Sequence, residues 1–341
     1  MTPRRSRLLA ALAAFALLAC LAAYRALRFT PRRSHVDAEF PTAPSTAERA
    51  ASAAASAPGS RDPFLVAIPP LDPSGARVAL VVRAKAMWPT PMGRILRRCL
   101  ERGGAAARWP SDVGFPLDAI DRLAFSDDMA ILDGNFAGAK LAGAFRAEAQ
   151  APHGPRATVY TRPAEGAEDQ AVARWGDHIL LNGRVSLVRA AIDRMDATDA
   201  TDAPRPAIPD DLAYGDVYGA VAMDLVAPRI ADGLPELAGA LSAAGDRVEI
   251  HVASGQDLLI TASVRSADPG GLARLNDALK GALLRARLGA RAMGDDDIVG
   301  FAESARVLPS SDAARVAAAL PTEGFERWLS HCFAEAPPAS R

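Results

Sequence analysis

An uninterrupted apolar run near the start of the chain constrains this protein more than any other feature of its sequence. Residues 8–24 are seventeen consecutive Leu, Ala, Phe, Cys or Tyr residues, six of them Leu. A helix needs roughly 17–25 apolar residues to span a hydrocarbon core of about 30 Å. We therefore predict a membrane anchor with basic flanks in residues 1–33, where arginines lie on both sides of the run.

The same run has two other interpretations. Ala14-Phe15-Ala16 resembles the small-residue cleavage site of a secretory signal, and Leu17-Leu18-Ala19-Cys20 resembles a lipoprotein motif. The run continues past both sites, which favours an uncleaved signal anchor. Because both flanks are basic, the positive-inside rule gives little orientation. Single N-terminal anchors commonly export the domain that follows, so we predict a single-pass protein of the bacterial inner membrane with a periplasmic domain.

The residues after the anchor have the composition of a linker. Residues 34–63 are rich in Ala, Ser, Pro and Thr and contain almost no large apolar side chain. Such a segment buries too little surface to offset the entropy of ordering it. We predict a disordered tether here, with a marginal alanine-rich helix at residues 47–57 as the alternative. The predicted organisation then continues with a first half at residues 64–196, a connecting loop at residues 197–211, a second half at residues 212–335 and a tail at residues 336–341.

Apolar periodicity predicts the secondary structure of both halves. In the first half we expect strands at residues 77–84, 120–125, 129–132, 158–161, 170–175 and 178–181, and helices at residues 89–101, 135–149 and 185–195. In the second half we expect strands at residues 216–223, 247–253, 258–264, 298–307 and 314–319. We expect helices at residues 225–243, interrupted at Gly233-Leu234-Pro235, and at residues 266–289 and 322–333.

The predicted elements follow a similar order in the two halves. Each runs strand, helix, hairpin, helix, further strands, helix. Ile120-Asp121-Arg122-Leu123 before the first hairpin also matches Gly245-Asp246-Arg247-Val248 before the second. We predict an α+β fold in which antiparallel sheet and packed helices occur in two similar halves, related by internal duplication.

Three longer phrases carry a resemblance to a group of proteins. They are PLDAIDRLAFSDDMAILDGNFAGAKL at residues 116–141, WGDHILLNG at residues 175–183 and ALPTEGFERWLSHC at residues 319–332. In these phrases the chain resembles uncharacterised, single-pass membrane-anchored proteins of high-GC bacteria. The resemblance covers most of the chain after Gly75 and implies no activity.

Composition and motifs disfavour several functions. The net charge of −1 and the aromatic content of 6% argue against a nucleic-acid partner. The sequence lacks the standard phosphate-binding, dinucleotide-binding, serine-hydrolase and zinc-protease motifs. Cys20, Cys99 and Cys332 are too far apart for a zinc or iron–sulfur site. We therefore predict no cofactor and no metal.

Three groups of residues that contain aspartate are candidates for chemistry. Asp177-His178 has the residue types of a catalytic relay, but no nucleophile is indicated nearby, and a hairpin turn is the simpler interpretation. Residues 295–297 are three aspartates that have the oxygen ligands of a cation site, yet they lack the calcium-loop pattern. Asp127-Asp128 has the same two interpretations, and the turn is favoured.

Cys99 and Cys332 are the most informative pair. In an oxidising compartment they are candidates for a disulfide that links the first helix of one half to the last helix of the other. Such a bond closes a loop of over two hundred residues and contributes a few kcal/mol. The alternative is two buried free thiols.

The sequence leaves two functional hypotheses. The first is a non-enzymatic envelope protein, held by the membrane through its N-terminal helix, with a protein partner in the envelope. The second is a hydrolase-like envelope enzyme whose site is assembled from distant residues such as Asp177, His178 and the aspartates at residues 295–297.

Overall fold

The computed structural model describes residues 62–71, 76–102, 114–162, 169–197, 206–293 and 296–329. The predicted anchor, nearly all of the predicted tether, Cys332 and the C-terminal tail lie outside these residues. Among the described residues, no helix is both long enough and apolar enough to cross a bilayer.

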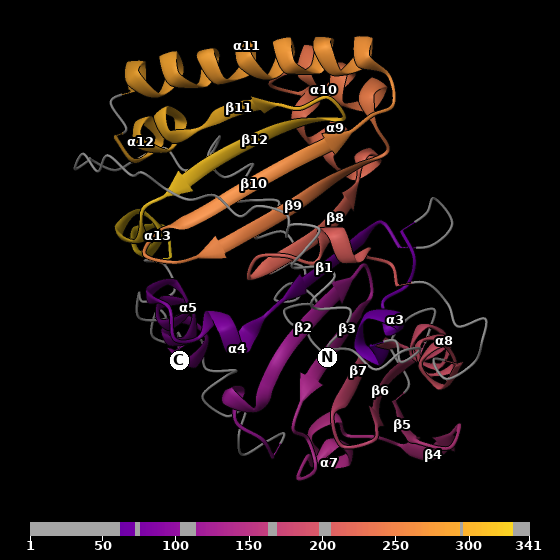
Figure 1. Ribbon diagram of the computed structural model, residues 1–341. Helices are drawn as coiled ribbons and strands as arrows, with labels where there is room; N and C mark the ends of the chain where they lie inside the picture. Colours follow the sequence, from indigo (N-terminus) through magenta and orange to yellow (C-terminus); the bar gives the residue numbers. More distant parts are fainter. Residues whose placement is uncertain are drawn as a thin grey trace, which may run out of the picture.

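The described part of the first half contains seven strands and several short helices (Figure 1). Its elements are α3 (Pro63–Ala67), β1 (Val78–Val82), α4 (Ala84–Met87), α5 (Pro91–Arg102), η1 (Leu117–Ala119), β2 (Ile120–Ser126), β3 (Met129–Gly134), α7 (Leu141–Phe145), β4 (Ala149–His153), β5 (Ala157–Arg162), β6 (Gln170–Trp175), β7 (Ile179–Arg184) and α8 (Val185–Asp196).

Five strands and longer helices occur in the part of the second half that the structure describes. Its elements are η3 (Asp210–Leu212), β8 (Val217–Ala222), α9 (Met223–Ala231), α10 (Pro235–Ala244), β9 (Arg247–Ser254), β10 (Leu258–Arg265), α11 (Pro269–Met293), α12 (Asp296–Ser304), β11 (Arg306–Pro309), β12 (Ala313–Leu320) and α13 (Thr322–Trp328).

The twelve strands found in the described residues belong to one antiparallel sheet. Their order is β11-β12-β10-β9-β8-β1-β2-β3-β7-β6-β5-β4. The order of strands outward from the centre is similar in the two halves. In the first half it runs β1, β2, β3, β7, β6, and in the second half β8, β9, β10, β12, β11. In each half the first strand is followed by a hairpin, then by the last strand and then by the strand before it. The predicted α+β fold with antiparallel sheet is confirmed. The outermost strands, β4 and β11, leave the sheet with two edges.

The halves meet where β1 pairs with β8. The register places Leu80 opposite Gly219. Gly219 has a φ of +149°, and a Cβ at this position would lie 2.0 Å from the backbone oxygen of Ala79. Only glycine fits this conformation and this close approach without strain. The central pairing therefore depends on the absence of one side chain.

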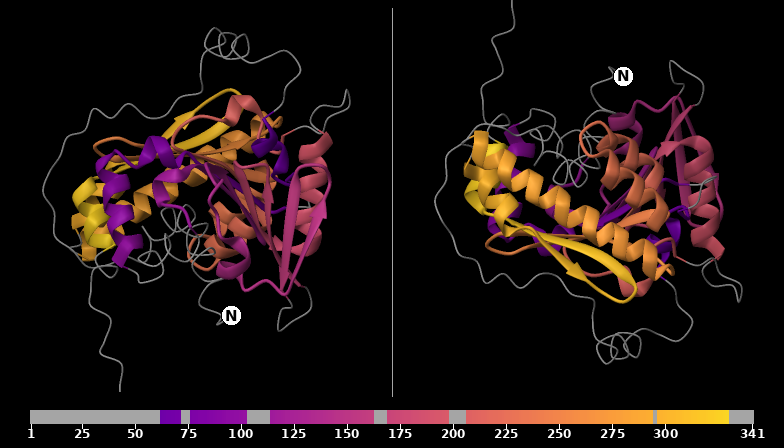
Figure 2. Two further views of the ribbon diagram at one scale, coloured as in Figure 1. Left: turned by 90° about the horizontal axis from the view of Figure 1, so that it is seen from below. Right: turned by 90° about the horizontal axis from the view of Figure 1, so that it is seen from above.

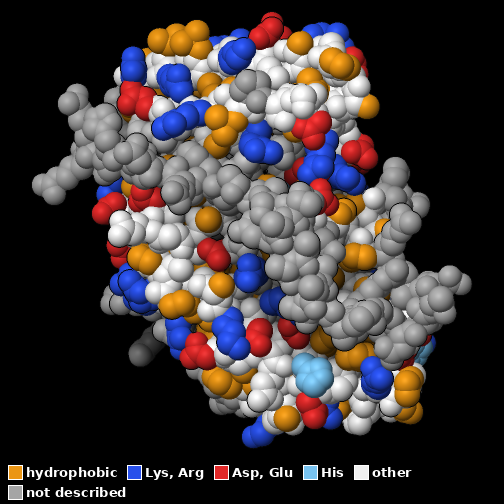
Figure 3. Space-filling model, in the orientation of Figure 1, with side chains coloured by type: hydrophobic (Ala, Val, Ile, Leu, Met, Phe, Trp, Pro, Cys, Tyr) orange, Lys and Arg blue, Asp and Glu red, His pale blue; other side chains and the backbone are white. Residues whose placement is uncertain are grey.

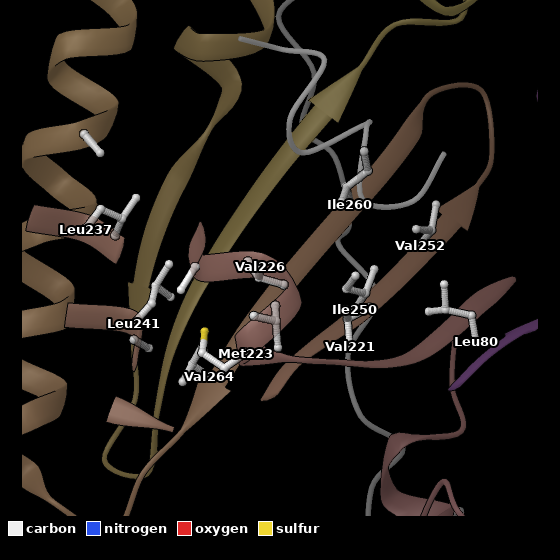
Figure 4. Packing of buried hydrophobic residues seen from close by; sticks show 14 of the residues in the cluster. Leu80, Val221, Met223, Val226, Leu237, Leu241, Ile250, Val252, Ile260 and Val264 are labelled. Carbon is white, nitrogen blue, oxygen red and sulfur yellow. The ribbon is translucent and has the colours of Figure 1, made fainter. Parts of the chain in front are cut away.

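Strand alternation places the main apolar core on one face of the second half. Val248, Ile250 and Val252 of β9 point into a cluster covered by α9, α10 and α11. Figure 4 shows Leu237 and Leu241 of α10 directed at this face of the strands. Side chains from α5 and α13, among them Ile95 and Phe325, complete the same cluster. A residue from each half thus helps to close one core.

A second core lies on the opposite face of the first half, under α3 and α8. Phe64 of α3 and Val188, Ala191 and Ile192 of α8 are fully buried in it. The helix predicted at residues 185–195, with these three side chains facing inward, is confirmed. Figure 1 shows α3 and α8 together beside the lower strands. Residues after the predicted tether therefore contribute directly to the core.

The start of the described chain is fastened by charged groups. Arg122 of β2 pairs with Asp62, and its Nε donates to Asp133 at 2.7 Å. The Arg122 guanidinium also lies 4.3 Å from the centre of the Phe64 ring. Burial raises the pKa of Asp133, and the Arg122 charge acts against this shift. These contacts tie α3 to the sheet at the point where the predicted tether ends.

Two sequence predictions are wrong. Residues 135–149 do not form one helix: α7 covers only Leu141–Phe145, Arg146 then adopts a left-handed φ of 52°, and Ala149 begins β4. Residues 298–307 do not form one strand, because α12 extends to Ser304 and only Arg306 begins β11. In both segments, pairing with neighbouring elements decides between two structures that the apolar pattern alone does not separate.

Candidate functional site

The residues proposed for a catalytic relay do not converge on a site. Asp177 and His178 lie at the exposed turn between β6 and β7. The Asp177 carboxylate is 3.8 Å from the Arg174 guanidinium, and its side chain is 63% exposed. The interpretation of this pair as a hairpin turn is therefore confirmed, and the pair supplies no support for an enzyme.

The other acidic candidates either bond to nearby residues or lie at positions whose side chains the structure does not describe. Asp127 accepts a bond of 2.6 Å from the Arg77 backbone amide, and Asp128 pairs with Arg184 at 2.6 Å. Both support the β2–β3 turn. Of the aspartates at residues 295–297, the first lies outside the described residues, and the side chains of the other two are not described. The described part of the chain contains no group of three metal-ligating side chains.

A shallow groove of about 510 Å³ separates α5 from α13. One wall carries Arg94, Arg97 and Arg98 of α5, and the other carries Thr322 and Glu326 of α13; Pro91 and Ile95 complete the lining. The arginines follow a spacing of three and then one residue, which puts them on one side of the helix. Figure 2 shows α5 and α13 next to each other in both views. The groove therefore has one wall from each half of the chain.

Ion pairs hold the groove arginines in place. Arg98 pairs with Glu326 at 3.0 Å across the groove, and Arg97 forms two bonds with Asp118, at 2.6 and 3.2 Å. Arg94 is exposed and donates one bond of 2.6 Å to the backbone oxygen of Pro89. Fixed guanidinium groups lose less entropy when they bind a carboxylate or a phosphate. Glu326 and Asp118 together offset two of the three arginine charges, so the local net charge is one positive charge.

This positive charge is local. Figure 3 shows basic and acidic side chains intermixed over the face that it displays. The whole chain has 39 Lys and Arg residues against 40 Asp and Glu residues. A polyanion is therefore not attracted by the molecule as a whole, and any preference for a negative partner depends on individual side chains.

Cys99 belongs to α5, the helix that forms the arginine wall. Its side chain is not described, and Cys332 lies outside the described residues, so the disulfide stays a prediction. The pair Arg98–Glu326 nevertheless joins the two helices that the bond was predicted to link.

A second polar group is buried on the other face of β9 and β10. Glu249, His251, Thr261 and Ser263 are each at most 4% exposed. Ser263 and Arg265 both bond to the Glu249 carboxylate, at 3.3 and 3.0 Å. His251 and Thr261 are direct cross-strand partners. Buried polar side chains of this kind usually have their hydrogen bonds satisfied.

Several polar atoms of this group have no hydrogen-bond partner among the described residues. They include Nε2 of His251, Oγ1 of Thr261 and Oε1 of Glu249. An unsatisfied buried polar atom costs about 1–3 kcal/mol.

Comparison with protein-family models, with curated proteins and with solved structures gives no match for this chain. Its function therefore has to be argued from its own residues.

Sequence reasoning missed both polar features. The apolar pattern predicts the helix at residues 89–101, but the spacing of its arginines does not by itself indicate a second wall. His251 was visible in a strand that alternates with Val248, Ile250 and Val252. Alternation places His251 on the face away from these three residues, and only the fold shows that another segment covers this face.

Proposed function

We propose that this chain is a single-pass membrane protein of the bacterial envelope that binds an acidic segment of a protein partner and catalyses no reaction. The apolar run at residues 8–24 supports the anchor. The observation that carries the binding role is the groove between α5 and α13, with three arginines on one helix. A tether at residues 34–63 would place this groove away from the bilayer.

The shape of the groove favours an extended peptide over an enclosed small molecule. Pro91 and Arg98 lie about 10 Å apart along the axis of α5, since a helix rises about 1.5 Å per residue. An extended segment of three or four residues covers this length. Its carboxylates would meet Arg94, while an apolar side chain would meet Pro91.

Charge reversal tests the groove. The probe is a fluorescent hexaglutamate peptide, and the readout is fluorescence anisotropy with the full-length chain in mild detergent. We expect Arg94→Glu to weaken binding about tenfold, since it removes one exposed ion pair and adds a repulsion, each worth up to about 1 kcal/mol. The matched control is Arg274→Glu on α11, another exposed arginine that is far from the groove in the sequence. Equal binding by both variants, or no binding by the wild type, refutes the proposal.

Membrane attachment has its own test. The full-length chain should stay in the membrane pellet after an alkaline carbonate wash, and protease added to spheroplasts should digest its body. Recovery of a freely soluble chain with intact first residues would refute the anchor.

We also infer that the two halves arose by duplication. The support is the matching strand order on both sides of the β1–β8 pair. In this alignment the β2–β3 hairpin corresponds to the β9–β10 hairpin, and Arg122 corresponds to Arg247. Superposition of the halves should bring these two arginines together, and a better superposition in another register would contradict duplication.

A further inference from the structure

Residues 206–216, the crossing segment, connect the two halves and lie across the polar face of the second half. Ile208 and Leu212 are buried in the core of the first half. Asp211 reaches Arg265 of β10 at 3.2 Å. At the end of the segment, the Asp216 carboxylate accepts bonds of 2.7 and 2.6 Å from the backbone amide and hydroxyl of Ser254. The segment is therefore fixed at its end and covers β9 and β10 along its middle.

Tyr214 is the residue of the crossing segment that contacts His251. The two rings stack with their centres 3.7 Å apart and an angle of 6° between their planes. Nδ1 of His251 lies 3.3 Å from the Tyr214 backbone oxygen. Since a carbonyl oxygen only accepts, Nδ1 carries the proton of the neutral ring and Nε2 carries the lone pair. A second proton must therefore add at Nε2.

The surroundings of Nε2 do not accommodate a positive charge. His251 is fully buried, and Nε2 has no hydrogen-bond partner among the described residues. The pKa of His251 is lowered to about 4, mainly by burial; the charges of Arg315 and Arg265 also lower this pKa, while the Tyr214 bond and the charge of Asp211 raise it.

The remaining groups on this face do not compensate for that charge. The Glu249 carboxylate is on the same side of β9 but bonds with Arg265 and Ser263. Thr261 and Tyr218, the cross-strand partners of His251, are uncharged. A protonated His251 is thus stabilised mainly by water, which reaches it only when Tyr214 moves away.

We propose that the crossing segment is a latch that opens when His251 takes up a proton. The neutral ring holds Tyr214 by the stack and by the Nδ1 bond. The charged ring favours the open state, in which water solvates it and in which Glu249, Thr261 and Ser263 become accessible. Opening would move residues 213–215 away from β9, while Ile208 and Leu212 stay in the core and the bonds between Asp216 and Ser254 hold the end of the segment.

The change in the ratio of open to closed molecules with pH follows from proton linkage. In the open state His251 has its ordinary pKa of 6.5. The closed state is then fully stable above pH 6.5 and loses stability as the pH falls from 6.5 towards 4. At pH 5 the ratio of open to closed molecules is about 30-fold higher than at pH 8, from the two pKa values through the linkage relation.

Hydrogen exchange of the peptide that covers the crossing segment tests the latch. The full-length chain is measured at pH 8 and pH 5, with each rate divided by the chemical exchange rate at that pH. The wild type should lose about 30-fold of its protection at pH 5, which follows from the linkage calculation. His251→Phe keeps a ring for the stack and removes the titration, so its protection should not depend on pH.

The matched control is His153→Gln. His153 is only partly buried, pairs with Asp193 at 2.9 Å and belongs to β4 of the first half. This variant should keep the wild-type pH response. If His251→Phe does not fold, His251→Gln provides the same comparison. A wild-type segment whose protection is the same at both pH values overturns the proposal, as does an unchanged pH response in either His251 variant. Neither result affects the arginine groove.

Discussion

Alanine at position 219 should separate the two halves of the sheet. The added Cβ would lie 2.0 Å from the Ala79 backbone oxygen and 2.8 Å from the Leu80 Cα, so the backbones of β1 and β8 must move apart. The φ of +149° is also unfavourable for alanine. Gly219→Ala therefore combines overpacking with backbone strain at the pair on which the continuous sheet depends.

The expected loss in the free energy of unfolding is large for a substitution that adds one methyl group. Overpacking costs about 1–3 kcal/mol, and a residue forced into a sparsely populated backbone region costs about 1–3 kcal/mol. Their sum centres on about 4 kcal/mol. For a chain of this size each kcal/mol lowers the melting temperature by roughly 2 °C, so we expect a fall of about 8 °C.

The matched control is the same substitution in an open environment. Gly239 lies in α10, and a Cβ at this position meets no atom within 4 Å. Gly239→Ala should stabilise the chain by about 1 kcal/mol, since alanine is the better helix former. Thermal unfolding of the full-length chain, followed by far-UV circular dichroism, gives both values. The reasoning is refuted if Gly219→Ala melts at the wild-type temperature.

Two further predictions concern the contacts that hold the elements together. Arg122→Met should destabilise the chain by about 2 kcal/mol, because it leaves the half-buried Asp133 without its cation; the cost is discounted for partial exposure. Denaturant unfolding measures this loss, and unchanged stability would show that the ion pair contributes nothing. If Cys99 and Cys332 pair, the unfolded full-length chain should have one free thiol without reductant, from Cys20, and three with it. Three free thiols under both conditions would exclude the bond.

Most regular elements were predictable because their side chains alternate regularly between a buried face and a more exposed face. Residues 170–175 alternate between buried and half-buried positions, and β6 spans the predicted residues. The edge strand β4 was not predictable, because most of its side chains are exposed and only its pairing with β5 makes it a strand. The helix α12 was mistaken for a strand because its apolar residues pack on both α11 and the sheet; Ala302 is buried, and Ser304 bonds to the backbone of Ala319.

The candidate sites were less predictable than the fold for a physical reason. Charged and polar residues such as Glu249 and His251 normally indicate a face in contact with water. Here the crossing segment covers that face, and its own sequence at residues 206–216 contains no regular pattern that predicts where it lies. The arginine groove likewise requires α13, a helix more than two hundred residues after α5, to become its second wall.

Each margin of the twelve-stranded sheet contains a proline. Pro152 lies within β4, and Pro309 ends β11. Proline has no amide hydrogen to offer to an incoming strand, and short edges that contain it are poor templates for extension. The exposed edges of a long continuous sheet can pair with the edges of other molecules and form fibrils. Pro152 and Pro309 each remove one backbone N–H donor from an edge strand, which disfavours such pairing.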